Sequence, residues 1–296
     1  MKRRLLAASS LVLALLVQPS TLAQKGQTKY VNRPVLNMFS SATTDTDVVS
    51  QAIFATPVTV LEEKDGWANI RTPDDYTGWV EAAALIRPDF AEPYLSGANK
   101  VIQVRSLFAH IYREASVTRH APMLTVPFET KLEVDSQSGA QKSERWLQVR
   151  LPDGRAGFIQ AGDVGPVASN LSVDETIALS KKFLGLPYTW GGTSSYGFDC
   201  SGFVQMLMRQ RGYMMPRDAG PQSRWERLVP VDRSELAPGD LLFFGSAPEK
   251  VTHTGMYIGD GFFINATTHE TPAVRIDNLN EPYWAKILVG ARRPRK

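Results

Sequence analysis

The chain has 296 residues, of which 43% are hydrophobic and 21% charged, and its formal net charge is +3 at pH 7. This length and composition suit a protein of two or three domains with packed cores. The excess positive charge lies at Lys2, Arg3 and Arg4, so the remainder of the chain is about neutral. Without a basic field we expect no nucleic-acid partner, and we expect the basic tail at 292–296 to be a solvated end.

The first 23 residues have the pattern of a secretory signal peptide. A basic head is followed by an apolar run from Leu5 to Val17 and by small residues that end at Ala23. This run is short for a membrane span, and no later stretch reaches the roughly 18 apolar residues that a span needs. We therefore expect residues 1–23 to be a cleaved leader. The mature chain would be exported, to the periplasm or to the outside of the cell, and would have no membrane span.

Residues 66–85 and 145–164 repeat each other, with Trp67 matching Trp146. Both copies alternate apolar and polar residues over short runs. Both then break at a Pro-Asp turn and resume with a glycine, an aromatic residue and an apolar residue. Such spacing predicts two small antiparallel barrels of short strands.

The repeat resembles the bacterial SH3-like domain, and we expect one such barrel in residues 24–95 and a second in residues 96–167. The Pro, Gly and polar content of residues 86–100 is typical of a linker. We expect Trp67 and Trp146 to lie in the barrel cores. The alternative is that the barrels hold or restrict a cell-wall ligand.

The stretch GFDCSGFVQMLMRQ, residues 197–210, contains the single cysteine of the chain, Cys200. Its apolar residues predict a buried helix of about three turns, and Asp199 is a good N-cap. Unsatisfied N–H groups and the helix dipole favour a thiolate in the first turn, so we expect a lowered pKa for Cys200. An exported chain with one cysteine has no internal disulfide. The thiol is therefore either a buried apolar side chain or a reactive nucleophile.

Residues 252–267 predict a hairpin that turns at Gly259–Gly261. This hairpin brings His253 and Asn265 close to opposite one another. An imidazole that accepts the thiol proton, together with an amide that fixes its tautomer, is the arrangement that nucleophilic cysteine catalysis requires. We expect His269 in an exposed loop. Without a paired His motif or a second cysteine, the sequence predicts no metal site.

The order of these motifs resembles that of the NlpC-type cell-wall cysteine peptidases. The matching stretches are YTWGG at 188–192, FDCSGF at 198–203, PR at 216–217, LAPGDL at 236–241 and HTGMYIG at 253–259. The resemblance implies an α+β papain-like catalytic domain in residues 168–296, preceded by the two small all-β SH3-like barrels. It implies no cofactor.

The resemblance also implies roles for single residues. Cys200 would be the nucleophile and His253 the general base. The third position, often histidine in the family, is Asn265 here, and the family accepts asparagine there. The hydroxyl of Tyr188 and the amide of Cys200 would form the oxyanion hole.

Enzymes of this family cut peptidoglycan stem peptides, often between γ-linked D-glutamate and the diamino acid. In relatives with SH3-like barrels the substrate often carries a free L-alanine amine, which needs a carboxylate partner. Asp199 and Asp218 are the candidates, and Ser201 is a candidate contact to the substrate main chain. The alternatives are an N-cap for Asp199 and a turn or a salt bridge for Asp218.

Two other functions are compatible with the sequence. The protein could be a non-catalytic wall-binding module with a degenerate peptidase domain. It could also be an amidase or a transpeptidase of the same fold. The intact set of Cys200, His253 and Asn265 favours the hydrolytic endopeptidase.

Overall fold

The structure is a computed structural model, which describes residues 26–88, 94–95, 100–135, 144–167 and 170–295. The leader predicted for residues 1–23 lies outside these ranges. Within the described ranges, no helix has the length and apolar character needed to cross a membrane.

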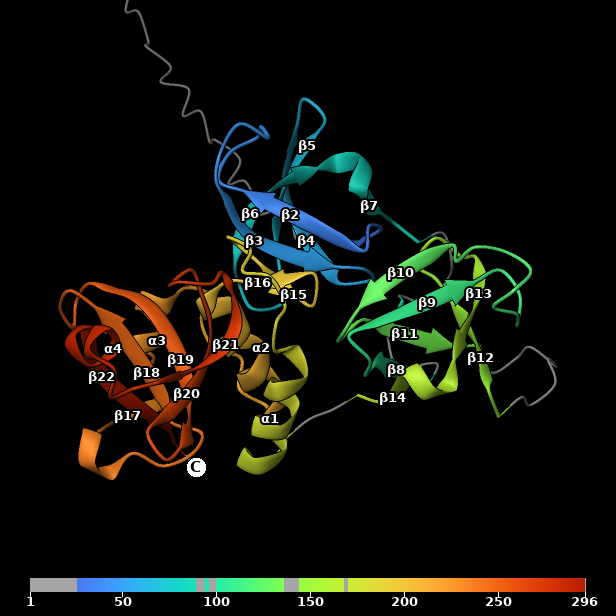
Figure 1. Ribbon diagram of the computed structural model, residues 1–296. Helices are drawn as coiled ribbons and strands as arrows, with labels where there is room; N and C mark the ends of the chain where they lie inside the picture. Colours follow the sequence, from blue (N-terminus) through green and yellow to red (C-terminus); the bar gives the residue numbers. More distant parts are fainter. Residues whose placement is uncertain (1–25, 89–93, 96–99, 136–143, 168–169, 296) are drawn as a thin grey trace, which may run out of the picture.

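The N-terminal half forms two seven-stranded antiparallel sheets with the same strand order (Figure 1). The first barrel contains β1 (Gln27–Val31), β2 (Val35–Phe39), β3 (Val48–Ile53), β4 (Pro57–Lys64), β5 (Trp67–Arg71), β6 (Thr77–Glu81) and β7 (Leu85–Ile86). The second contains β8 (Val101–Val104), β9 (Phe108–Tyr112), β10 (Leu124–Pro127), β11 (Lys131–Val134), β12 (Trp146–Arg150), β13 (Ala156–Gln160) and β14 (Val164–Pro166). The order β3-β2-β6-β5-β4-β1-β7 recurs as β10-β9-β13-β12-β11-β8-β14, so each strand has its counterpart seven places later. The first barrel has an apolar core of its own, and the apolar core of the second barrel extends to Tyr30, Phe54 and Ala55 of the first.

The repeated tryptophans do not lie in the barrel cores, so that prediction was wrong. Trp67 is half-buried and packs edge-on against Phe39, with ring centroids 5.8 Å apart. Trp146 packs in the same way against Tyr112 at 5.6 Å. Side chains alternate across a strand, and in β5 the residue after the tryptophan, Ala68, takes the inward position.

The segment predicted as a linker contains a buried residue that joins the barrels. The side chain of Tyr94 is 2% exposed and packs with the core of the second barrel. The hydroxyl of Tyr30, from β1, donates to the Tyr94 carbonyl at 2.7 Å, and the Tyr94 hydroxyl donates to the Arg150 carbonyl at 2.7 Å. These bonds tie the two barrels together at this residue.

The C-terminal part is a six-stranded antiparallel sheet with helices on both faces. Its strands, in spatial order, are β17 (Leu228–Val231), β22 (Leu288–Pro294), β18 (Leu241–Gly245), β19 (Val251–Gly259), β20 (Phe262–Thr267) and β21 (Ala273–Asn278). The helices are α1 (Val173–Ser180), α2 (Cys200–Gln210), α3 (Ala219–Ser223) and α4 (Pro282–Ile287), and a small ribbon pairs β15 (Thr193–Ser194) with β16 (Gly197–Phe198). Among the described residues, short 3-10 helices also form at Ala82–Ala84, Ala161–Asp163, Lys181–Phe183 and Arg233–Glu235.

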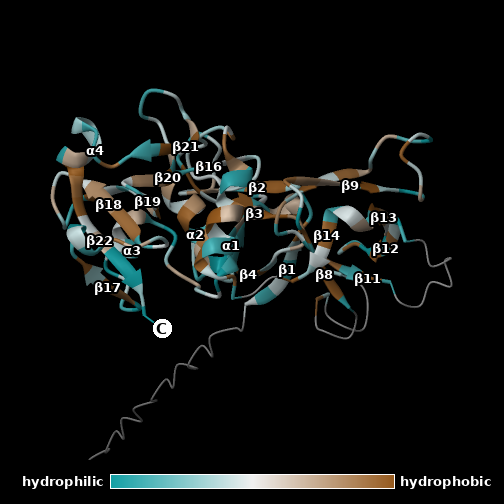
Figure 2. Cartoon of the chain, turned by 60° about the horizontal axis from the view of Figure 1, so that its bottom comes forward, coloured by the Kyte–Doolittle hydropathy of each residue, from teal (hydrophilic) through white to brown (hydrophobic). Residues whose placement is uncertain are grey.

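Two apolar clusters cover the two faces of this sheet. Helix α2 packs on one face, where Phe203 and Leu207 meet Phe243 and Met256. On the other face, Trp284 of α4 packs with the neighbouring apolar side chains of the strands. Figure 2 shows apolar residues, in brown, along α2 and β18. The sequence of α2 is apolar on several sides because the helix is buried almost throughout its length.

The basic tail is partly built into the sheet, although Arg293 and Arg295 remain exposed as expected and Lys296 lies outside the described residues. Residues Leu288–Pro294 form β22, which lies between β17 and β18 in the sheet. The guanidinium of Arg293 forms two bonds to the buried carboxylate of Asp240, at 2.7 and 2.8 Å. Arg292 and Arg293 therefore belong to a strand whose residues differ in exposure along its length.

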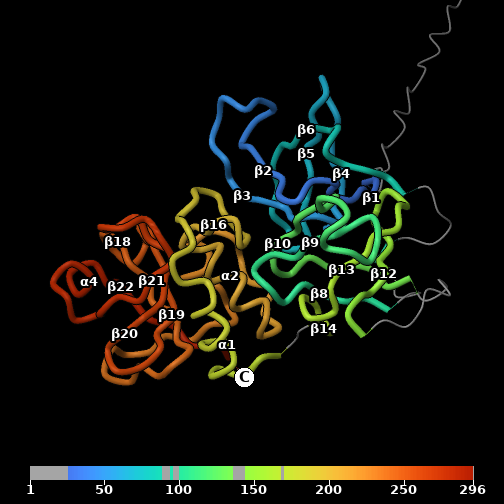
Figure 3. The backbone as a smooth tube through the Cα atoms, turned by 45° about the vertical axis from the view of Figure 1, so that its right-hand side comes forward, coloured from blue at the N-terminus to red at the C-terminus, as the bar shows by residue number. Residues whose placement is uncertain are grey.

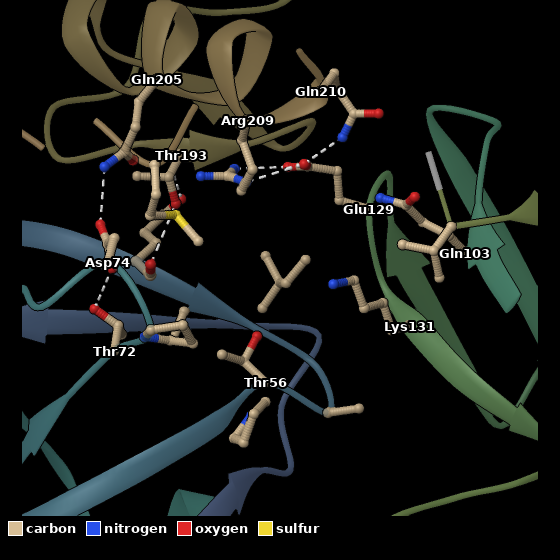
Figure 4. Close-up of a pocket in the computed structure, with 18 of the residues that line it drawn as sticks. Thr56, Thr72, Asp74, Gln103, Glu129, Lys131, Thr193, Gln205, Arg209 and Gln210 are labelled. Carbon is tan, nitrogen blue, oxygen red and sulfur yellow. Dashed lines mark hydrogen bonds and ion pairs between the residues drawn. The ribbon is translucent and has the colours of Figure 1, made fainter. Parts of the chain in front are cut away.

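Helix α2 is held by both barrels (Figures 1 and 3). Figure 4 shows Glu129, from the second barrel, bonded to Arg209 at 2.6 and 3.0 Å and to Gln210 at 2.5 Å. From the first barrel, Asp74 accepts a hydrogen bond from Gln205 at 2.8 Å. These pairs line a cavity of about 730 Å³ where the three parts of the chain meet. The barrels thus fix the helix whose first residue is the single cysteine.

Glu129→Ala should lower the free energy of unfolding by about 2 kcal/mol, because it leaves the partly buried Arg209 and the buried Gln210 without their acceptor. Urea denaturation followed by tryptophan fluorescence measures this change. Glu114→Ala removes an ion pair to the exposed Arg119 and serves as the control, with an expected loss of about 0.5 kcal/mol. Equal losses in the two variants would contradict the interface role of Glu129.

Candidate active site

The start of α2 places the thiol as the sequence predicted. The carboxylate of Asp199 accepts a hydrogen bond from the Gly202 amide at 2.7 Å, so Asp199 is the N-cap and Cys200 is the first helical residue. Position 202 must be glycine, because a Cβ there would lie 2.2 Å from the carbonyl oxygen of Gly192. The loop that carries the YTWGG motif therefore packs directly on the helix start.

The sulfur of Cys200 lies against β19 at Thr252, the residue before His253. The Cys200 side chain is buried, and its Sγ is 4.0 Å from the carbonyl oxygen of Thr252. The β18–β19 pairing shifts register at the same point, between Phe244 and Gly245. Such a bulge changes the direction of the neighbouring side chains and is frequent beside active sites. A distant helix and a distant strand thus meet where the sequence placed the thiol and the imidazole.

The imidazole of His253 has its tautomer fixed by Asn265. Nε2 of His253 lies 2.9 Å from Oδ1 of Asn265. The Asn265 amide nitrogen donates to a carboxylate oxygen of Asp277 at 2.9 Å and to the Arg275 carbonyl at 3.3 Å. Because both of these groups are acceptors, the amide nitrogen must face them and Oδ1 must face the ring. Nε2 of His253 therefore carries the proton, and Nδ1 retains the lone pair that can accept one.

The predicted hairpin sets this pairing. Met256 of β19 pairs with Ile264 of β20, which puts Asn265 opposite Gly255 and diagonal to His253. A Cβ at Gly255 would lie 3.1 Å from the Cβ of Asn265, so glycine gives the amide room to reach along the strand. The prediction that the hairpin brings His253 and Asn265 together is confirmed by their hydrogen bond.

Aromatic rings enclose the imidazole. Trp284 stacks on His253, with ring centroids 5.3 Å apart, and Phe244 packs beside it at 5.6 Å. His269 lies in a loop as predicted, but its ring stacks on Tyr283 at 3.7 Å and is only partly exposed. This packing holds the His253 ring in one orientation and limits the access of water.

The resting thiol is neutral, and the predicted thiolate is wrong for this state. Burial, with the charge of Asp199 second, raises the pKa of Cys200 to about 12. Burial also lowers the pKa of His253 to about 4, against the hydrogen bond to Asn265 and the charges of Asp277 and Asp199. The loss of hydration at the buried helix start outweighs the N–H groups and the dipole that favour a thiolate. At neutral pH the site therefore pairs a thiol with a neutral imidazole.

Tyr188 is a hydrogen-bond donor beside the thiol. Burial raises the pKa of Tyr188, and the Cys200 thiolate that forms at high pH raises it further. The phenol therefore keeps its proton at neutral pH. The Tyr188 amide donates to the Pro272 carbonyl at 3.2 Å, which fixes the backbone of this residue. A fixed neutral phenol next to the sulfur has the chemistry that an oxyanion hole requires.

Asp199 is occupied by protein donors. Arg217 binds both of its carboxylate oxygens, at 2.5 and 3.0 Å, and also donates to the Ser201 hydroxyl at 2.9 Å. The same guanidinium donates to Ser50 of the first barrel at 3.2 Å. The N-cap alternative for Asp199 is therefore the arrangement present in the structure. The geometry gives no support to Asp199 as a ligand for a substrate amine.

Asp218 faces the first barrel. The hydroxyl of Tyr76 donates to the Asp218 carboxylate at 3.2 Å, and burial, with the Asp218 charge second, raises the pKa of Tyr76 to about 12. Both residues line a pocket of about 330 Å³, together with Asp74, Asp75 and Arg217. Three carboxylates around one pocket favour a cationic group. Arg217 links this pocket to the helix start, because it also binds the N-cap of α2.

Sequence reasoning did not find four residues of this site. Arg217 is part of the PR motif, which could have identified it, but Tyr76 sits in a barrel turn about 120 residues before the thiol. Asp277 and Trp284 lie in later elements whose local sequence carries no sign of a site. Only the tertiary fold brings these side chains together.

Two family models match the chain. The model described as the NlpC/P60 family matches residues 185–293. The model described as the bacterial dipeptidyl-peptidase Sh3 domain matches residues 38–85. The first match contains Cys200, His253 and Asn265, and the second covers most of the first barrel.

Similar proteins come from two Bacillus species. The chain is 33% identical to a gamma-D-glutamyl-L-lysine dipeptidyl-peptidase of Bacillus cereus over 82% of this chain and 74% of that protein. It is 29% identical to the protein of the same name from Bacillus subtilis, over 84% of this chain and 82% of that protein. A crystal structure of an NlpC/P60 family protein from Bacillus cereus aligns with a TM-score of 0.77 and 27% identity, over 91% of this chain and 100% of that chain. The similarity therefore extends from the catalytic sheet into the barrels.

The partly buried, neutral imidazole of His253 should make stability depend on pH between about 6.5 and about 4. In this window the unfolded chain protonates His253 and the folded chain does not, so the free energy of unfolding should fall as the pH falls. His253→Gln should flatten this part of the curve. Urea midpoints measured from pH 4 to pH 7 test the difference between the two proteins. Parallel curves for both would show that folded His253 titrates like an exposed histidine.

Proposed function

Because the chain belongs to the NlpC/P60 family of cysteine peptidases, with an SH3-like all-β region ahead of the catalytic domain, we propose that it hydrolyses peptidoglycan stem peptides between γ-linked D-glutamate and the diamino acid. The names of the two Bacillus relatives support the proposal that this bond is cleaved and that a dipeptide is released. The observation that carries the proposal is the hydrogen bond that Nε2 of His253 donates to Oδ1 of Asn265, one residue along β19 from the Thr252 carbonyl that the Cys200 sulfur contacts.

In the proposed mechanism, the proton of Cys200 moves to Nδ1 of His253 as the sulfur attacks the carbonyl carbon of the scissile amide. The transfer accompanies the attack because the resting pair is neutral. The Tyr188 hydroxyl and the Cys200 amide donate to the oxygen that gains negative charge. The imidazolium then gives its proton to the leaving amine, and the C–N bond breaks to leave a thioester.

A water molecule then completes the turnover. Nδ1 of His253 takes a proton from the water as its oxygen attacks the thioester carbonyl. The C–S bond breaks, and the proton returns to the sulfur. The products are a peptide ending in the glutamate γ-carboxylate and a peptide beginning with the diamino acid. Asn265 keeps the ring in one tautomer through both halves of the reaction.

We further propose that Asp218 binds the free N-terminal ammonium of the substrate. Its exposed carboxylate, the Tyr76 hydroxyl and the acidic pocket between them favour a cation. An enzyme that releases dipeptides needs a group that binds the free amine, because this contact places the bond after the second residue at the nucleophile. The hydroxyl of Ser201, next to the thiol, is the proposed contact to the substrate main chain.

The barrels fit a protein that acts on short wall fragments. Tyr76 and Ser50 of the first barrel reach the catalytic domain, so this barrel would close one end of the cleft. We propose that the second barrel is also SH3-like, since it repeats the strand order of the first. The leader pattern of residues 1–23 supports export to the cell wall, and muropeptide fragments are the proposed substrates.

Cys200→Ala should abolish peptide release from L-Ala-γ-D-Glu-L-Lys and from the diaminopimelate analogue, because it removes the attacking sulfur. Mass spectrometry of the products identifies the bond that the native protein cuts. It also separates hydrolysis from amidase and transpeptidase products. Release of free diamino acid by the variant at the native rate would refute the mechanism.

Asp218→Asn should lower kcat/KM for the tripeptide with a free amine by about tenfold to a hundredfold, since a hydrogen bond to a charged group contributes about 1.5–3 kcal/mol. Tyr76→Phe should have a smaller effect in the same direction. Asp260→Asn, in the exposed hairpin turn, is the matched control. An Asp218 variant that keeps the native preference for the free amine over the N-acetylated peptide would rule out this role.

A further inference from the structure

The proposed mechanism does not use Asp277, a carboxylate in β21 that is 3% exposed. One of its oxygens accepts the hydrogen bond from the Asn265 amide nitrogen at 2.9 Å, and the other pairs with Arg275 at 2.6 Å. A buried carboxylate usually has its charge compensated by such partners. Here one of the two partners is the residue that fixes the catalytic imidazole.

The orientation of Asn265 decides whether His253 can act as a base. The two ends of an asparagine amide have nearly the same shape, so hydrogen-bond partners determine which end faces the ring. With the amide reversed, its nitrogen would face Nε2, which would then have to be the acceptor. The proton of the neutral ring would move to Nδ1, and Nδ1 could no longer take the proton of Cys200.

Two acceptors oppose this reversal, the Arg275 carbonyl and Asp277. The bond to the carboxylate is shorter, at 2.9 Å against 3.3 Å, and charge-assisted bonds are about twice as strong as neutral ones. A reversed amide would present its oxygen to Asp277, and an ionised carboxylate has no proton to donate to that oxygen. The Arg275 guanidinium holds Asp277 in place and also bonds to the His269 carbonyl at 3.3 Å and to Glu270 at 3.2 Å.

We propose that Asp277 is a positioning residue of the active site. It holds the amide of Asn265 with Oδ1 toward His253, and thereby keeps the proton on Nε2 and the lone pair on Nδ1. This role rests on the proposed function of the site, since it matters only if His253 accepts the proton of Cys200. In the competing explanation, Asp277 only completes an ion pair with Arg275 that stabilises the sheet.

A double-mutant cycle separates the two roles. The variants are Asp277→Ala, Asn265→Ala and the double variant, with Glu270→Gln as the control that removes the negative charge from another partner of Arg275 without touching Asn265. The readout is the rate constant for alkylation by iodoacetamide at neutral pH. Because the chain contains one cysteine, alkylation reports Cys200 alone. Circular dichroism at the assay temperature verifies that each variant is folded.

Asp277→Ala should slow alkylation by about tenfold in the native background, as outer partners of a positioned group commonly do. In the Asn265→Ala background the same change should alter the rate by less than about twofold, because there is no amide left to orient. Glu270→Gln should leave the rate unchanged. The same tenfold loss in both backgrounds, or no loss in the native background, would overturn the proposal.

Asp277→Asn is the substitute if the alanine variant does not fold. Its single amide oxygen can serve only one of the two donors, so a loss of about threefold is expected in the native background and none in the Asn265→Ala background. The cycle needs no peptide substrate. A native protein that cleaves no stem peptide would therefore refute the proposed function and leave this test intact.

Discussion

The hydrogen bond between Asn265 and His253 is the interaction on which the site depends. It requires the β19–β20 register that puts Asn265 opposite Gly255, where an added Cβ would come within 3.1 Å of the Asn265 Cβ and 2.8 Å of the Phe263 ring. It also requires the two acceptors in β21 that turn the amide oxygen toward the ring. Three neighbouring strands therefore cooperate to define one proton position on one imidazole.

Burial gives this site a neutral resting state. Helix α2 begins against the sheet, and the resulting loss of hydration raises the pKa of the thiol and lowers that of the imidazole. Arg217 compensates the negative charge of the N-cap Asp199 and also donates a hydrogen bond to Ser50 of the first barrel. The helix start is thus fixed by groups from two parts of the chain. Under the proposed mechanism, the reactivity of the sulfur comes from a positioned base and not from a thiolate that is present before substrate binds.

Local sequence patterns predicted the helices and strands, whereas the pKa of the thiol and several partners of the site depend on tertiary contacts. The helix with Asp199 as its N-cap, the hairpin at Gly259–Gly261 and the repeated strands follow from signals within about ten residues of sequence. The helix start, the hairpin and the family resemblance together pointed to Cys200, His253 and Asn265. The pKa of the thiol could not be read from the helix start alone, because it depends on what buries that helix. Tyr76 and Asp277 carry no local signal, since their roles exist only through partners that are distant in sequence or in a neighbouring strand.

The tautomer of His253 tests the central claim most directly. Nitrogen-15 NMR of histidine-labelled protein at neutral pH distinguishes a protonated from an unprotonated ring nitrogen, and comparison with a His253→Gln sample assigns the signals among the four histidines. The account predicts a neutral His253 ring with its proton on Nε2 and an unprotonated Nδ1. A proton on Nδ1, or an imidazolium at neutral pH, would contradict it.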